Sequence, residues 1–173
     1  HRQAGGWTRT LTSGRGVELS KHGEIVDCET CGRSRPRPRG SSPISCACGA
    51  ELDPQKLVAR RIVQPLGGRR PPGWRPLIAG EDVRRYEAER SREIEVGIEG
   101  INYKASPAKG PRLLVRKTGI GLKGALYEGN ALTTQTVFHY QATDESPGFL
   151  LAYALGVLSS RVMLAVHLKR SGE

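Results

Sequence analysis

Aromatic residues are scarce in this chain, because Phe, Trp and Tyr together make up only 5% of its 173 residues. Folds that stack bases on an aromatic sheet surface, such as the RRM and the OB fold, are therefore disfavoured. The chain also lacks a long apolar run. Its longest, Phe149 to Leu158, is too short to span a bilayer and is followed by Ser159, Ser160 and Arg161. We expect no membrane partner.

The N-terminus lacks the succession of charged, apolar and small residues that marks a signal peptide, and His1 is not a methionine. We therefore expect a cytoplasmic protein and interpret the sequence as a piece excised from a longer one. With 173 residues, the chain has room for one substantial domain or two small ones, but not for a large enzyme.

Acidic residues are outnumbered: 17 Asp and Glu stand against 27 Lys and Arg, which gives a formal net charge of +10. Such an excess favours a polyanionic partner, most simply a nucleic acid. Residues 1–75 hold 14 basic and 6 acidic side chains, a net charge of +8, whereas residues 76–173 hold 13 and 11, a net charge of +2. This imbalance predicts two modules with different roles, of which the basic one faces phosphates.

The run from Gly67 to Pro76 contains three prolines and three glycines, which is typical of a linker or a rigid turn. We take it as the module boundary. The predicted organisation is a basic segment with its four cysteines at 1–68, a linker at 69–76 and a second module at 77–173.

Local patterns predict an α+β fold with a mixed sheet. Residues 52–66 are compatible with either a short helix or a pair of strands. Residues 81–92 combine strong helix formers with acids at their start, which indicates an amphipathic helix. Strand patterns occur at residues 94–101, 112–118 and 132–140. Residues 149–169, apolar almost all round, predict one buried C-terminal helix.

The four cysteines form two pairs, Cys28-x2-Cys31 and Cys46-x-Cys48, and each pair is followed by a glycine. Two tight turns of this kind can bring four thiolates around a tetrahedral zinc ion, and glycine lets each turn fold back so that backbone N–H groups face the sulfurs. With four protein ligands, such a site is closed and structural. The alternatives are two disulfides or unrelated buried thiols. We expect a zinc-ribbon-like insertion.

Between the cysteine pairs, arginines alternate with serine and prolines from Arg33 to Arg39. On a loop stiffened by proline, Arg35, Arg37 and Arg39 are suited to follow a phosphate backbone. A solvated loop without a partner is the alternative.

A second motif, Gly119-Ile-Gly121-Leu-Lys-Gly124, matches G-x-G-x-x-G after a predicted strand. A dinucleotide site also needs a helix opening there and an acidic residue about twenty positions further on, after a second strand. The motif is followed by Tyr127-Glu128-Gly129-Asn130, which has no helical period, so we expect no nucleotide cofactor. We also expect no small-molecule substrate and no catalytic residue in this chain.

From residue 74 onward, the order of motifs resembles the TaqI-like C-terminal specificity domain, the target-recognition part of adenine-specific (N-6) DNA methyltransferases and of type I and type IIG restriction-modification enzymes. The matching segments are Trp74–Tyr86 (WRPLIAGEDVRRY), Pro111–Gly119 (PRLLVRKTG), Asn130–Tyr140 and Phe149–Val162 (FLLAYALGVLSSRV). The family's usual Asn in the last segment is Ser159 here.

The resemblance implies sequence-specific recognition of double-stranded DNA, in cis to a methyltransferase domain. The [DNS]-P-P-[FYW] motif of that catalytic domain is missing from this chain. Methylation and binding of the AdoMet cofactor are therefore expected in sequence outside it, with the target base flipped out toward that domain. A zinc-ribbon adaptor that binds protein or RNA is the alternative function.

Side chains that can read base edges in a major groove are Arg, Lys, Asn and Gln on exposed turns. The candidates for contact with bases are Arg116, Lys117, Thr118, Lys123, Asn130 and Gln135. In the predicted linker, Arg69, Arg70 and Arg75 are better suited to phosphates.

Overall fold

The computed structural model describes residues 10–19, 23–37, 43–53, 58–67, 72–103, 110–119, 121–144 and 146–171. Within them, strands β1 to β13 precede two helices at the end of the chain, so the α+β prediction is confirmed.

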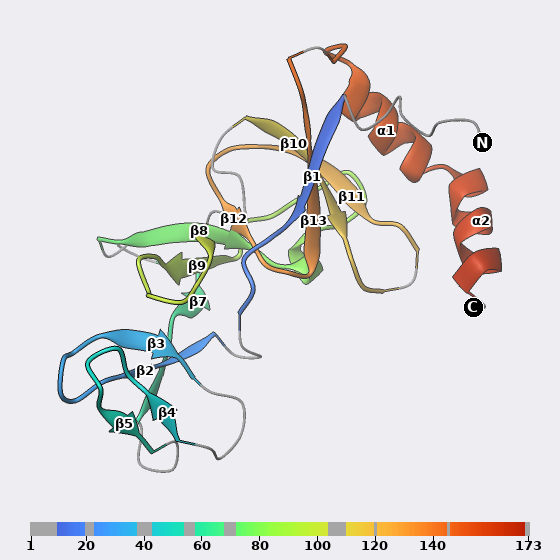
Figure 1. Cartoon of the computed structure of the whole chain (residues 1–173). Helices are drawn as coiled ribbons and strands as arrows, with labels where there is room; N and C mark the ends of the chain where they lie inside the picture. Colours follow the sequence, from blue (N-terminus) through green and yellow to red (C-terminus); the bar gives the residue numbers. More distant parts are fainter. Residues whose placement is uncertain are drawn as a thin grey trace, which may run out of the picture.

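The largest antiparallel sheet has the strand order β1 (Leu11–Arg15), β13 (Val137–Ala142), β10 (Pro111–Arg116) and β11 (Gly124–Glu128) (Figure 1). Strand β10 is buried on both faces. Leu113 packs in one cluster with Leu151 and Leu155 of the first helix, whereas Leu114 packs in another with residues of the neighbouring sheet. Successive side chains of a strand point to opposite faces, so this one strand joins two parts of the core.

A second four-stranded sheet has the order β12 (Leu132–Thr133), β8 (Trp74–Ile78), β9 (Arg92–Glu95) and β7 (Val63–Pro65), with β12 parallel to β8 and the other pairs antiparallel. The short turn between β12 and β13 carries the chain from this sheet into the first one (Figure 1). The two sheets therefore share a core in which Ile78 packs with Val137 and Leu114.

The cysteine-bearing part consists of a three-stranded sheet and a small hairpin, at the lower left of Figure 1. The sheet has the order β3 (Ser34–Pro36), β2 (Glu24–Asp27) and β6 (Ala59–Arg61), and the hairpin pairs β4 (Ile44–Ser45) with β5 (Glu51–Leu52). Ile62, which is fully buried, separates β6 from β7, so this part is continuous with the second sheet.

The division of the chain at residues 69–76 does not follow the sheets. Strand β1 lies in the same sheet as β13, β7 pairs with β9, and β8 begins at Trp74, inside the expected linker. One hydrophobic cluster contains Ile25 and Ile62 from the N-terminal side together with Leu77 and Ile94 from the C-terminal side. Long-range strand pairing, which local composition does not reveal, joins the two halves in one core.

Instead of the predicted buried helix over residues 149–169, the structure has two helices, α1 (Leu150–Leu158) and α2 (Arg161–Ser171), with a bend of 60° between them. The break arises at Ser160, whose hydroxyl accepts a hydrogen bond from Met163 N–H at 3.2 Å and so caps the second helix. The burial prediction also fails. Helix α1 covers the sheet with Leu151 and Leu155, but Tyr153 on its other face is 57% exposed.

In the part of the chain that the structure describes, no single helix is long and apolar enough to cross a membrane, and α1 and α2 meet that test only when taken together across their bend.

The helix predicted at residues 81–92 is replaced by a single 3-10 turn, Gly80–Asp82, and by an irregular segment that leads into β9. Asp82 is buried, and its carboxylate accepts hydrogen bonds from Ala79 N–H at 2.8 Å, Ser91 Oγ at 2.6 Å and Arg92 Nη1 at 3.2 Å. These side-chain hydrogen bonds hold the segment in a non-helical conformation and outweigh its helix propensity.

Candidate metal centre and nucleic-acid interface

The four cysteines converge from two similar turns. In the first turn, Gly32 has φ 70° and its N–H donates to Cys28 O at 2.7 Å; in the second, Gly49 has φ 88° and its N–H donates to Cys46 O at 2.9 Å. A left-handed conformation at these positions suits glycine, which explains the glycine after each cysteine pair. The turns bring all four Sγ atoms within 4.8 Å of one another.

The spacing of the sulfurs fits a tetrahedral metal. The Sγ atoms of Cys28 and Cys48 are 3.7 Å apart, and those of Cys31 and Cys46 are 3.5 Å apart. Four sulfurs at 2.3 Å from a central ion would lie about 3.8 Å from one another. A disulfide needs about 2.05 Å, and all four cysteines are free. The prediction of a four-cysteine cluster that can hold a metal such as zinc is confirmed.

Backbone amides prepare this cluster for anionic sulfur. The N–H of Cys48, more than any other group, lowers the pKa of the Cys46 thiol, to about 6, and the N–H of Cys31 likewise lowers the pKa of Cys28. The Arg33 amide acts in the same direction on Cys31, but burial and the neighbouring thiols raise the pKa of Cys31 to about 12. A bound cation would favour the thiolate at every position, because a metal ligand must be deprotonated.

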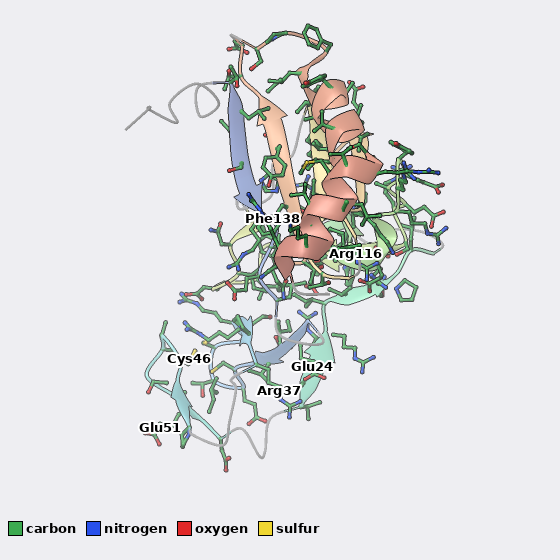
Figure 2. All side chains as sticks on the ribbon, turned by 90° about the vertical axis from the view of Figure 1, so that its right-hand side faces the viewer. Glu24, Arg37, Cys46, Glu51, Arg116 and Phe138 are labelled. Atoms are coloured by element: carbon green, nitrogen blue, oxygen red, sulfur yellow. The ribbon has the colours of Figure 1, made fainter. Side chains whose placement is uncertain are left out.

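The arginines near the cysteines are engaged in ion pairs. Arg35 Nη2 lies 3.3 Å from Glu99 Oε1, and Arg37 Nη1 lies 2.8 Å from Glu24 Oε2. Figure 2 shows Arg37 and Glu24 at the same end of the molecule as Cys46. These contacts neutralise part of the positive charge that the sequence places here. Among the other expected phosphate contacts, Arg39, Arg69 and Arg70 lie outside the described residues.

Four of the predicted DNA-contacting residues lie together where β10 turns into β11, and Arg116 is the last residue of β10. Lys117, Thr118 and Lys123 are exposed, while Arg116 is half-buried. The turn is anchored at its base, because Lys117 N–H donates to Thr136 O at 2.9 Å and Arg116 N–H donates to Lys123 O at 2.9 Å. Within the described residues, none of its three cations forms an ion pair with an acidic side chain. We name the residues 116–119 and 121–123 the basic turn.

The basic turn lies at the end of the large sheet, near the helices. A Cβ atom added at Gly121 would lie 3.2 Å from Leu164 Cδ1 of α2. In Figure 2, Arg116 lies away from the labelled Cys46 and Glu51. The structure therefore separates the candidate residues of the basic turn from the arginines near the cysteines, a separation that the sequence alone could not show.

Arg75 and Asn130 are brought together by the fold. Arg75 Nη2 donates to the backbone carbonyl of Asn130 at 2.6 Å, and Arg75 is only partly exposed. Its guanidinium thereby fixes the loop after β11. Asn130 itself is exposed, and the expectation that its side-chain amide contacts a base stays a prediction.

The side chain of Gln135 forms two hydrogen bonds with the backbone of Leu19. Its Oε1 accepts from Leu19 N–H at 3.2 Å and its Nε2 donates to Leu19 O at 3.1 Å, so both ends of the amide are engaged 116 residues away in the sequence. A base edge would have to compete with both bonds. The geometry gives this side chain a positioning role on the β12–β13 turn, which packs against the basic turn through Thr136.

Two residues next to the basic turn are not among those predicted from the sequence. Arg85 Nη2 donates to Ser159 O at 2.8 Å, at the end of α1, and Tyr86 N–H donates to Gly124 O at 2.8 Å, next to Lys123. Both belong to the segment whose sequence pattern predicted a helix. Only the tertiary structure brings them to the basic turn.

Comparison with models of known protein families gives no match, and comparison with curated protein sequences gives none either.

Proposed function

We propose that this chain binds double-stranded DNA as the target-recognition part of an adenine-specific DNA methyltransferase of a restriction-modification system. In this proposal the basic turn contacts the duplex. The cysteine cluster binds one structural zinc ion. The methyltransferase domain that would bind AdoMet and flip the base belongs to other sequence in cis, since this sequence lacks the [DNS]-P-P-[FYW] motif of that domain.

The observation that supports this proposal best is the unequal pairing of the cations. Arg35 and Arg37 are held by Glu99 and Glu24, whereas Lys117 and Lys123 are exposed and without an acidic partner in the described chain. Unpaired cations on a glycine-containing turn can approach phosphates closely and release counterions on binding. Ion-paired arginines would first have to leave their carboxylates.

The zinc ion has a structural role in this proposal. Four thiolates complete a tetrahedral shell, so no position is left for a reacting water or substrate. Small strands such as β4 and β5, two residues each, gain their fixed place from the metal and its two turns. The zinc thereby positions strand β3, which carries Arg35, and takes no part in a reaction.

A salt titration tests the proposal. Binding of a fluorescein-labelled 20-base-pair duplex is measured by anisotropy between 50 and 200 mM NaCl, conditions in which each phosphate contact contributes about 0.9 to the slope of log K against log salt. We expect K117A/K123A to weaken binding at every salt concentration and to reduce this slope by about 2.

The matched control is R35A/R37A, which also removes two positive charges, but from residues that form ion pairs. We expect a smaller change in slope than for K117A/K123A. If R35A/R37A reduces the slope and K117A/K123A leaves it unchanged, the duplex lies on the cysteine side and the proposed interface is wrong. Absence of duplex binding at 50 mM NaCl, with RNA or an acidic protein bound instead, would refute DNA recognition altogether.

A further inference from the structure

Tyr86 has an unusual backbone conformation for an exposed side chain. With φ 70°, it is the only non-glycine residue with a positive φ in the described part of the chain. A bulky residue pays an energetic cost in this region, and such residues concentrate at functional sites. Its side chain is nonetheless 56% exposed, so burial of the ring does not compensate for this cost.

The strained residue is held firmly on both sides. Tyr86 N–H donates to Gly124 O at 2.8 Å, and the preceding Arg84 N–H donates to Glu87 O at 2.8 Å across the turn. The guanidinium of Arg85 lies 5.1 Å from the centroid of the Tyr86 ring and is fixed by its bond to Ser159 O at 2.8 Å. Hydrogen bonding from Arg85 lowers the pKa of the Tyr86 hydroxyl. The ring and the guanidinium form one preorganised platform.

This platform adjoins the basic turn. Gly124, which accepts the Tyr86 hydrogen bond, directly follows the exposed Lys123. The acidic residues nearest in sequence are Glu87 and Glu89, and Glu89 lies 3.7 Å from Arg84. An exposed aromatic ring backed by a guanidinium, on a segment that is hydrogen-bonded to the residue after Lys123, is suited to a base face beside a phosphate backbone, because stacking and charge act on adjacent parts of one nucleotide.

We propose that the Arg85–Tyr86 platform stacks on an unpaired or unstacked base of the DNA held by the basic turn. The proposal rests on the proposed function. It adds a contact to the face of an exposed base, which depends on the base being unstacked and not on the hydrogen-bonding groups of its edge. Unstacking costs least where a base already lacks its partner. The chain should therefore prefer a duplex with one unpaired base to the fully matched duplex.

The test compares two labelled 20-base-pair duplexes that differ only by one central unpaired adenine. The wild-type protein is expected to bind the bulged duplex more tightly than the matched one. Tyr86→Ala should weaken binding of the bulged duplex by about 5- to 100-fold, and Tyr86→Phe should retain it, because stacking uses the ring face.

Tyr86→Gly separates recognition from folding. Glycine adopts φ 70° without strain, so this variant should unfold at the same temperature as the wild type or higher, yet lose the preference for the bulged duplex. If Tyr86→Gly lowers the melting temperature and keeps the preference, the residue is structural and the inference is wrong.

The outcomes also separate the two proposals. If the wild type binds both duplexes equally, with the salt slope carried by Lys117 and Lys123, base stacking is refuted and DNA binding stands. If Tyr86→Ala and the wild type show the same preference for the bulge, another residue provides it and the platform is refuted. If neither duplex is bound, both proposals fail.

Discussion

Removal of the metal should unfold the hairpin at residues 43–53 while the large sheet keeps its structure. We consider Cys46→Ser, which changes a residue that is 4% exposed, and compare it with Ser45→Ala, a change at the exposed residue that precedes it at the end of β4. Hydroxyl oxygen is a far weaker zinc ligand than thiolate, so Cys46→Ser should lower zinc content below the one ion per chain expected for the wild type.

The magnitude follows from the small core of this hairpin. Its hydrophobic cluster consists of Cys28, Cys46, Leu52 and the partly buried Ala50, which together contribute roughly 5 kcal/mol on burial. Ordering the eleven backbone residues 43–53 costs roughly 11–22 kcal/mol. Binding of a structural zinc ion supplies about 10–16 kcal/mol, which is the size of the difference. The hairpin therefore depends on the metal.

Hydrogen exchange followed by mass spectrometry measures this dependence. In Cys46→Ser, amides of residues 43–53 should exchange at least about a hundredfold faster, which corresponds to roughly 3 kcal/mol at 1.4 kcal/mol per factor of ten. Amides of β10 and β13 serve as the internal reference, and Ser45→Ala should behave as wild type. Equal protection of residues 43–53 in the wild type with and without chelator would refute the reasoning.

Two further predictions concern the large sheet. A Cβ atom at Gly16 would overlap the backbone carbonyls of Thr133 and Thr134, so Gly16→Ala should cost about 3 kcal/mol of stability and lower the melting temperature by roughly 6–12 °C. A Cβ atom at Gly156 on α1 would meet nothing within 4 Å, so Gly156→Ala should raise stability by about 0.5–1 kcal/mol. If calorimetry gives Gly16→Ala the melting temperature of the wild type, the close approach at Gly16 is contradicted. Burial, with a smaller contribution from Arg112, lowers the pKa of His139 from 6.5 to about 4. As pH drops from 6.5 to 4, His139 therefore binds a proton in the unfolded chain before it does so in the folded one, and the unfolding free energy should fall by up to roughly 3 kcal/mol. Urea titrations at several pH values should find a smaller fall in His139→Gln.

Where the chemistry is local, the sequence determined the result. The two cysteine pairs and the glycine after each could be recognised from spacing alone, because each turn is closed by hydrogen bonds within a few residues. The strand at 112–118 appears as β10 (Pro111–Arg116), since its apolar run suits a strand buried on both faces. The resemblance to a specificity domain and the DNA function built on it stay predictions.

Tertiary structure decided which charges are available. Arg35 and its partner Glu99 are 64 residues apart, and Gln135 and Leu19 are 116 apart, so no local pattern could show that these side chains are engaged. Around Asp82, hydrogen bonds of its buried carboxylate replace the predicted helix by a turn, and the bond from Tyr86 N–H to the distant Gly124 O joins this segment to the basic turn. Residue type limits what a side chain can bind, but distant backbone and carboxylate groups determine whether it is free to do so.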